Sequence, residues 1–279
     1  MNPPPITVTY HALDTGYCLA SERHVIRGGQ RRQIECHSLV VLIEHPRQGW
    51  LLWDAGYAPR MLEATQRLPF SLYRRITPLR LRPDLAVIAQ LPRFGLTPAD
   101  IRRVLISHFH ADHIAGLRDF PQAEFIASRA AYDYVAPREG LAALRCGFIP
   151  ALLPEDFDQR LTLLPAFKDA PLPALGPTYD LFGDGSLRLV ALPGHARGQM
   201  GLLAQTERGP RLFAADSCWL SRSVYECRPP HRVTHLLIDD ARAVRATIER
   251  LHQFLEACPE VALVPSHCPE AFAREVQQL

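Results

Sequence analysis

The feature that most constrains this chain is a group of four side chains able to bind metal within six residues, His108-Phe-His-Ala-Asp-His113. The apolar run Arg103-Val-Leu-Ile106 comes just before it and is typical of a buried strand. Imidazole and carboxylate groups together suit zinc, and also iron or manganese. We therefore expect a metal site at the carboxyl end of a strand.

Three shorter elements farther along the chain have the same character. Pro193-Gly-His195, Ala215-Asp216 and Pro265-Ser-His267 follow the apolar runs that end at Leu192, Ala214 and Val264. A single histidine after a strand is more often an ordinary hydrogen-bonded loop residue. Three such elements beside the first cluster favour one shared site, because strand ends meet at the edge of a sheet.

The predicted strands fall into two clusters, with helical patterns after each. Ser38–Glu44 and Trp50–Asp54 predict a hairpin of buried strands. The apolar spacing from Asp239 to Leu255 predicts a long amphipathic helix. This succession predicts an α/β (α+β) chain in which two sheets pack face to face with helices outside.

We expect one domain over residues 1–279, with two covering segments. The stretch near 57–95 has helical spacing that prolines interrupt, so short helices are expected there. The stretch near 137–180 is rich in proline and weak in periodicity, and we expect an insertion or a flap. The alternation of Ile6–Tyr10 predicts a short exposed strand.

Composition excludes several classes of partner. The 279 residues include 31 Lys and Arg against 29 Asp and Glu, a net charge of +2 that is too balanced for a protein selected to bind nucleic acid. No apolar run approaches the length of a membrane span, so no stable membrane insertion is expected. The seven cysteines are scattered without a Cys-x-x-Cys pair, and the amino terminus lacks a signal-peptide pattern, which favours the cytoplasm. A small-molecule substrate is the expected partner, and a homodimer is left open.

The order of these residues resembles the metallo-β-lactamase superfamily. The matching elements are His108-x-His110-x-Asp112-His113, Gly194-His195, Asp216 and His267, with Asp54-Ala-Gly56 upstream. The resemblance implies a four-layer αβ/βα sandwich of two mixed β-sheets, with two divalent metal ions at one edge. His108, His110 and His195 would hold the first ion, Asp112, His113 and His267 the second, and Asp216 would bridge them. Zn²⁺ is the expected ion, and Fe or Mn are alternatives.

Within the superfamily, the chain is most similar to the N-acyl homoserine lactone lactonases, enzymes of bacterial quorum quenching. The similarity rests on Gly16-Tyr-Cys18 through Gln33, on Leu52-Trp-Asp54-Ala-Gly56 and on Leu192-Pro-Gly-His195-Ala-Arg-Gly198-Gln. An aspartate at 216 argues against the antibiotic-hydrolysing branch, which uses a thiolate. The lactonases usually place a tyrosine three residues after the bridging aspartate. Here that residue is Trp219, and Tyr225 is the candidate to replace the tyrosine.

The resemblance implies hydrolysis by a hydroxide that bridges two metal ions and attacks a carboxylic ester, preferably a lactone such as an N-acyl homoserine lactone. Asp112 is the expected catalytic residue, which orients the hydroxide and passes its proton to the leaving group. Asp54 is expected to accept a hydrogen bond from a ligand histidine. The alternative is that Asp54 only caps the turn before Ala55-Gly56.

Substrate contacts are expected from Trp219 and Tyr225, and from an apolar wall that includes Phe70, Tyr73 and Phe148. The wall residues have an alternative role in ordinary helix packing or dimer contacts. Two enzymatic alternatives use the same site: hydrolysis of a phosphodiester or phosphotriester, and hydrolysis of a thioester. The non-enzymatic alternative is a metal-containing sensor that binds a ligand without turnover.

Overall fold

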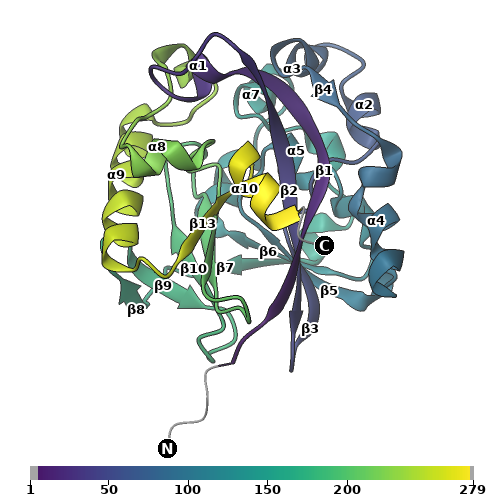
Figure 1. The fold of residues 1–279 in the computed structure, drawn as a ribbon. Helices are drawn as coiled ribbons and strands as arrows, with labels where there is room; N and C mark the ends of the chain where they lie inside the picture. Colours follow the sequence, from purple (N-terminus) through teal and green to yellow (C-terminus); the bar gives the residue numbers. More distant parts are fainter. Residues whose placement is uncertain (1–5, 277–279) are drawn as a thin grey trace, which may run out of the picture.

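The computed structural model describes residues 6–276, which form two β-sheets packed face to face (Figure 1). In spatial order, the first sheet has seven strands: β4 (Leu79–Arg80), β1 (Thr9–Ser21), β2 (Gln33–His45), β3 (Gly49–Trp53), β5 (Ile101–Ile106), β6 (Glu124–Ser128) and β7 (Leu161–Leu164). The second has six: β13 (Ala262–Pro265), β12 (Arg211–Ala215), β11 (Met200–Ala204), β10 (Leu187–Ala191), β9 (Gly176–Asp180) and β8 (Asp169–Leu172).

Both sheets are mixed. Strands β3, β5, β6 and β7 run parallel to one another, as do β12 and β13, whereas the remaining paired strands are antiparallel. Helices cover the outer faces, with α9 (Ala241–Ala257) beside the second sheet and α2 (Arg60–Ala64) and α4 (Val87–Gln90) on the opposite side of the molecule (Figure 1). The predicted four-layer sandwich of two mixed sheets is therefore confirmed.

The other helices are short. They are α1 (Glu22–Val25), α3 (Ser71–Ile76), α5 (Ala111–Ile114), α6 (Arg129–Val135), α7 (Gly140–Arg145), α8 (Ser221–Tyr225) and α10 (Pro269–Val276). Single 3₁₀ turns are η1 (Pro83–Leu85), η2 (Leu91–Phe94), η3 (Pro98–Asp100), η4 (Leu117–Asp119), η5 (Pro150–Leu152), η6 (Phe157–Gln159) and η7 (Arg232–Leu236). Within residues 6–276, no helix has the length and apolar character that a bilayer span requires.

The long helix α9 shows how sequence fixes an outer layer. The Asp240 carboxylate accepts hydrogen bonds from the first backbone N–H groups of the helix, at Arg242 and Ala243. Val244, Ile248 and Leu251 repeat at three- and four-residue spacing and are buried against the second sheet. The predicted amphipathic helix is thus confirmed.

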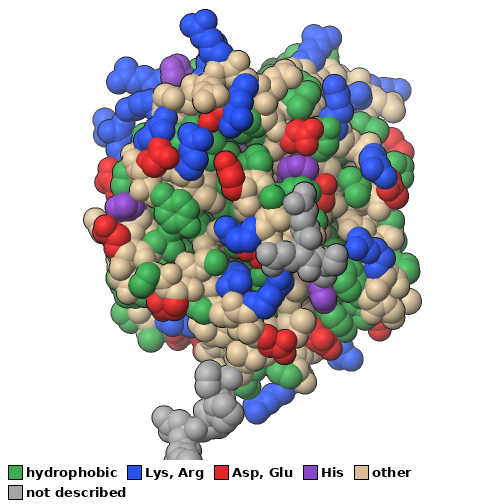
Figure 2. Space-filling model, viewed as in Figure 1, with side chains coloured by type: hydrophobic (Ala, Val, Ile, Leu, Met, Phe, Trp, Pro, Cys, Tyr) green, Lys and Arg blue, Asp and Glu red, His purple; other side chains and the backbone are tan. Residues whose placement is uncertain are grey.

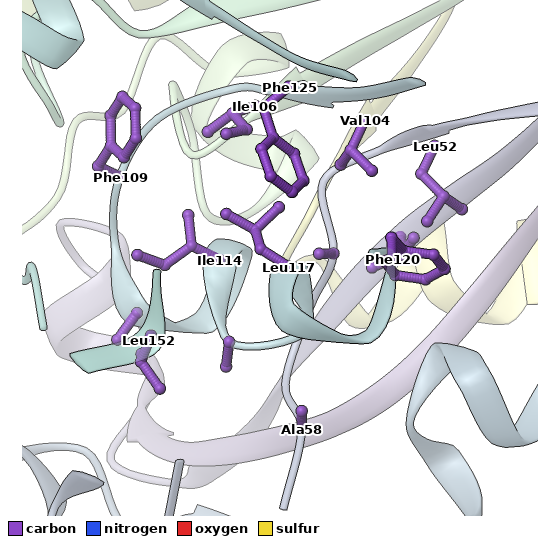
Figure 3. Packing of buried hydrophobic residues seen from close by; sticks show 14 of the residues in the cluster. Leu52, Ala58, Val104, Ile106, Phe109, Ile114, Leu117, Phe120, Phe125 and Leu152 are labelled. Carbon is purple, nitrogen blue, oxygen red and sulfur yellow. The ribbon is translucent and has the colours of Figure 1, made fainter. Parts of the chain in front are cut away.

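Apolar packing also fixes the short helix α5, which begins just after the first histidines of the motif. Ile114 and, on the following turn, Leu117 are buried beside Ile106 and Phe125 of the first sheet (Figure 3). A helix of four residues is too short to be stable alone, so these contacts hold it in place. The side chains of residues 112 and 113 therefore have a rigid support.

Two local predictions were wrong. The predicted strand Ile6–Tyr10 is replaced by a strand that begins at Thr9 and runs to Ser21, and the bulge between Asp14 and Tyr17 breaks its alternation. The stretch 137–180 is more than a flap, because it contains β7 and β8, each at the edge of one sheet, and β9, which pairs with β8 and β10. A proline interrupts the pattern of β8 and another that of β9, so periodicity did not predict these two strands.

Candidate metal centre

The polar elements of the sequence meet at one edge of the sandwich. His108 and His110 lie in the loop after β5, and Asp112 and His113 lie on α5. From the second sheet, His195 follows β10, Asp216 directly follows β12, and His267 follows β13. The site is thus built where the ends of both sheets come together.

One group of side chains comprises His108, His110, His195 and Asp216, which offer ligand atoms within 4.8 Å of one another. His110 Nδ1 and His195 Nε2 lie 2.9 Å apart. His195 Nε2 is 3.2 Å from Asp216 Oδ2. Three imidazoles and a carboxylate at these separations are a donor set that suits zinc.

A second group comprises Asp112, His113, Asp216 and His267, again within 4.8 Å of one another. His113 Nε2 lies 3.2 Å from Asp216 Oδ1, and His267 Nε2 lies 2.9 Å from Asp216 Oδ2. His267 Nε2 is also 3.3 Å from Asp112 Oδ2. Asp216 belongs to both groups, so its carboxylate is positioned to bridge two ions.

Several buried polar atoms of these groups have no hydrogen-bond partner within the described chain. They include His108 Nε2, His113 Nε2 and Asp216 Oδ1. Buried polar atoms in folded proteins are nearly always paired, because leaving one unpaired costs about 1–3 kcal/mol. The donor set therefore fits a pair of divalent metal ions.

Neighbouring groups hold the histidine rings in one orientation. Asp54 Oδ2 accepts a hydrogen bond from His113 Nδ1 at 2.8 Å, which leaves Nε2 of that ring facing the site. His267 Nδ1 donates to the carbonyl oxygen of His37 at 2.5 Å in the same way. Such contacts select the tautomer that presents a lone pair to a metal.

Asp54 is fully buried and lies at the end of β3, in a left-handed conformation with φ 62°. Its carboxylate also accepts hydrogen bonds from the Ser107 backbone N–H and from the Ser107 hydroxyl, each at 2.8 Å. It therefore links the start of the histidine loop to α5. This geometry agrees with a ligand-orienting role and goes beyond the capping of a turn.

The charges of the second group depend on one another. Burial raises the pKa of Asp216, but His267, His113 and His195 outweigh this and hold the pKa well below its usual range. Burial lowers the pKa of His113 and His267, and the surrounding carboxylates overcome burial and raise both pKa values well above the ordinary one. Metal binding must displace these protons, so metal affinity is expected to increase with pH.

The first group behaves differently. Burial lowers the pKa of His108 well below its usual range, and nearby imidazoles lower it further. Burial lowers the pKa of His195 to about 3. These rings are therefore neutral near pH 7, with lone pairs available to a metal.

A cavity of about 670 Å³ opens directly onto the two groups. Asp112, His195, Asp216 and His267 lie in its wall, and most of the rest of the lining is apolar. Its rim carries five exposed aliphatic side chains: Ile76, Leu141, Val233, Leu236 and Leu237. An apolar cavity with a few polar groups at its base is typical of a small-molecule site.

Two of the predicted substrate contacts line this cavity. The Trp219 indole N–H donates to Asp216 Oδ2 at 3.3 Å, and its ring lies 5.6 Å from that of His195. The Tyr73 hydroxyl donates to Asp112 Oδ1 at 3.3 Å, although the sequence had suggested only an apolar contact. Burial and the Asp112 carboxylate raise the pKa of Tyr73 well above its usual range, so this phenol stays protonated.

Three other predicted contacts lie outside the cavity wall. Phe148 is buried in the core, with its ring 6.2 Å from that of Phe109, so its apolar surface is used in packing. Phe70 packs against the same core. Tyr225 ends helix α8 with 52% of its surface exposed and does not replace the missing tyrosine.

Several cavity residues were missed by the sequence analysis. Cys18 and Cys36 lie on β1 and β2, and Tyr57 follows β3. Leu144 belongs to α7, and the rim residues Val233 and Leu236 belong to η7. No local pattern marks these residues, because only the packing of distant segments brings them to one cavity.

One family model and several known proteins are similar to this chain. The family model described as the metallo-beta-lactamase superfamily matches residues 34–218. The N-acyl homoserine lactonase AttM of Azorhizobium caulinodans is 34% identical over 140 residues, 50% of this chain and 49% of that protein. The AttM lactonase of Rhizobium radiobacter is 29% identical over 195 residues, 69% and 68% of the two chains. The match thus spans about half the length of the first relative and about two thirds of the second.

A solved structure of an N-acyl homoserine lactone hydrolase, with N-hexanoyl-L-homoserine at its catalytic metal centre, has the same fold. The TM-score is 0.71, with 18% sequence identity over 95% of both chains. A probable metallo-hydrolase of Mycobacterium bovis is 25% identical over 252 residues, 85% of this chain and 76% of that one. The shared architecture therefore extends beyond the segment that the family model matches.

Proposed function

Because this chain belongs to the metallo-beta-lactamase superfamily, we propose that it is a dinuclear metal-dependent hydrolase that opens lactones, with N-acyl homoserine lactones as the preferred class. The observation that carries the proposal is the position of Asp216, which is shared by two groups of ligand atoms at the base of an apolar cavity. The names of the relatives, N-acyl homoserine lactonases, support the choice of substrate.

We assign the first ion to His108, His110 and His195, the second to Asp112, His113 and His267, and Asp216 to both. When bound, two divalent ions supply an activated water and polarise the scissile carbonyl. Zn²⁺ is the preferred ion because imidazoles dominate the donor set. A cytoplasmic location, one domain with covering segments, and a possible homodimer stay predictions.

We assign Asp112 as the catalytic acid and base. One oxygen lies beside His267 and the other accepts a hydrogen bond from Tyr73. A carboxylate held from two sides keeps its orientation while it takes a proton from the attacking water and passes it to the leaving oxygen. The protonated Tyr73 phenol is close enough to donate to a substrate oxygen at the same point, since it already reaches the carboxylate of Asp112.

The cavity favours a substrate with an apolar tail. Leu19, Val25 and Leu144 line it, and the aliphatic rim continues this surface outward. Burial of apolar surface contributes about 25 cal/mol per Å². Each lengthening of the substrate's acyl chain by two methylene groups is therefore expected to strengthen binding. Figure 2 shows Lys and Arg side chains gathered at the end of the molecule where Figure 1 has α1 and α3.

A pH-indicator screen of the metal-loaded protein tests the proposal. The panel contains N-acyl homoserine lactones of increasing chain length, simple lactones, linear esters, thioesters and bis-aryl phosphates. The expected result is fastest acid release from acylated lactones, with kcat/KM increasing with chain length. Faster phosphate ester or thioester cleavage would instead favour those alternatives. Tight lactone binding without acid release from any substrate would favour the ligand-binding sensor.

A further inference from the structure

Two cysteines face each other in the wall of the cavity. Cys18 on β1 and Cys36 on β2 are directly opposite in an antiparallel pair. Opposite residues in such pairs have Cα atoms about 4.5–5.5 Å apart, which lies within the range of about 4.4–6.8 Å found for disulfides. All seven cysteines of the chain are free thiols in this structure. The strand pairing therefore holds two reduced thiols in a position that suits a disulfide.

The β-bulge in β1 sets the strand register that places Cys18 opposite Cys36. The register of β1 against β2 shifts between Asp14 and Tyr17, where Gly16 has φ +118°. After this shift Cys18 is opposite Cys36, and both side chains line the cavity with Asp112 and His267. Cys18 is partly exposed and Cys36 is buried, so a water-soluble reagent that enters the cavity reaches Cys18 more readily than Cys36.

The surroundings distinguish this pair from the other cysteines. Cys218 is buried in the packing between the second sheet and its helices, whereas Cys227 is exposed at the surface. Hydrogen bonding from the Cys36 thiol lowers the pKa of Cys18, although burial opposes this. The thiolate is the reactive form of cysteine, so Cys18 is the residue expected to react first.

The pair is also connected to the candidate metal ligands. The residue after Cys36 is His37, whose carbonyl oxygen accepts the hydrogen bond from His267 Nδ1. The next residue, Ser38, donates its hydroxyl to the carbonyl oxygen of Asp112 at 2.8 Å. A covalent bond at Cys36 therefore acts on the backbone segment that orients His267 and Asp112.

We propose that Cys18 and Cys36 form an oxidation site, at which a peroxide converts the two thiols into a disulfide that lowers hydrolase activity. In the first step the Cys18 thiolate attacks a peroxide oxygen, so that an S–O bond forms and the O–O bond breaks; with hydrogen peroxide, the leaving hydroxide takes a proton from solvent and becomes water, and Cys18 becomes a sulfenic acid. In the second step the Cys36 sulfur attacks the Cys18 sulfur, so that the S–S bond forms, the S–O bond breaks and a second water leaves. The two sulfurs are oxidised and the peroxide is reduced.

The formation of the disulfide is tested by mass spectrometry. The metal-loaded full chain is treated with hydrogen peroxide, its remaining thiols are alkylated, and its peptides are mapped with and without dithiothreitol. The expected product joins the peptides of Cys18 and Cys36, has lost two hydrogen atoms, and separates on reduction. Alkylation of both cysteines after a treatment that oxidises the exposed Cys227 would overturn the proposal.

The effect on activity rests on the proposed function and is measured separately. We expect peroxide to lower lactone turnover about tenfold, the lower end of the effect of disturbing groups that hold ligands, with recovery in dithiothreitol. Cys18→Ser and Cys36→Ser should each keep their own untreated rate after peroxide, whereas the matched surface variant Cys227→Ser should lose activity like the parent. Equal loss in Cys18→Ser would overturn the regulatory part. An untreated protein without hydrolase activity would instead contradict the proposed function, and the peptide map would still report on the disulfide.

Discussion

Asp112 combines two roles that a single substitution separates. Its carboxylate belongs to the second group of ligand atoms and also accepts the Tyr73 hydrogen bond. Asp112→Asn keeps an oxygen for a metal but cannot accept a proton, so we expect kcat to fall by about 10²–10⁴-fold, the usual contribution of a general acid or base. Metal content and lactone turnover are measured on the same sample. Near-normal turnover with both ions bound would remove Asp112 from proton transfer.

Tyr73 donates a hydrogen bond to this carboxylate. Tyr73→Phe keeps the ring but removes the hydroxyl, and we expect kcat/KM to fall about tenfold, the value of one hydrogen bond to a charged group. Tyr132→Phe is the matched control, since that phenol also donates to an aspartate, Asp158, but away from the cavity. Equal kinetics for the two variants would show that the Tyr73 hydroxyl has no part in the reaction.

Asp54 is expected to act through the residues that its carboxylate holds, His113 and Ser107. Asp54→Asn replaces the carboxylate that accepts from His113 Nδ1, so that the ring loses its fixed tautomer. We expect metal affinity to fall about 10–100-fold, as for other residues that hold a ligand, measured by competition with a chromogenic chelator. Unchanged affinity in a variant that unfolds at the parent temperature would contradict this role.

At the scale of elements, a buried carboxylate ties α1 to its neighbours. Glu22 accepts hydrogen bonds from Arg32 at 2.5 Å and from Arg222 of α8 at 3.2 Å. The Arg32 hydrogen bond lowers the pKa of Glu22 below its ordinary value, against the opposing effect of burial. A lowered pKa stabilises the fold above the unfolded-state value of about 4.3, and this stability is lost as the pH falls through the folded-state pKa.

Glu22→Gln tests this contribution. We expect the free energy of unfolding of the parent to decrease more steeply than that of the variant as the pH falls from about 5 to 3. Urea unfolding at several pH values gives both curves. Parallel curves would mean that Glu22 has the same pKa in the folded and unfolded chains.

The strand ends of the site were predictable from sequence because each ligand follows a short apolar run directly. His108, His195 and Asp216 needed only this local pattern and the rule that such ends share an edge. Strand β1 was not predictable, because its bulge at Asp14–Tyr17 removes the alternation on which a prediction depends. Strands β8 and β9 each contain a proline and lack an apolar run, and β7 has only four residues, so their pairing partners had to be known first.

The lining of the cavity was also difficult to predict from sequence. No local pattern in the sequence marks Tyr73 or Cys18. Their roles depend on residues distant in sequence: Tyr73 contacts Asp112, and Cys18 lies opposite Cys36. Phe148 was expected in the cavity wall because it is a large apolar residue, but its side chain packs in the core instead. Sequence therefore predicted which metal-competent side chains meet at one edge, because they follow strand ends. It missed much of the cavity wall, because wall residues depend on how covering segments pack.

At the scale of the whole molecule, the site joins the two sheets. The first sheet and α5 provide His108, His110, Asp112 and His113, and the second provides His195, Asp216 and His267. Ions bound between the sheets stabilise the folded chain over the unfolded one by mass action. We expect the unfolding temperature to fall on chelation and to recover with metal. An unfolding temperature that does not depend on metal would contradict binding at this junction.

The most direct test is a titration of chelated protein with Zn²⁺ while acid release from an N-acyl homoserine lactone is recorded. The seven side chains of the two groups predict that activity is absent without metal and reaches its plateau at two ions per chain. Full activity without metal, or a plateau at one ion per chain, would contradict the dinuclear hydrolase.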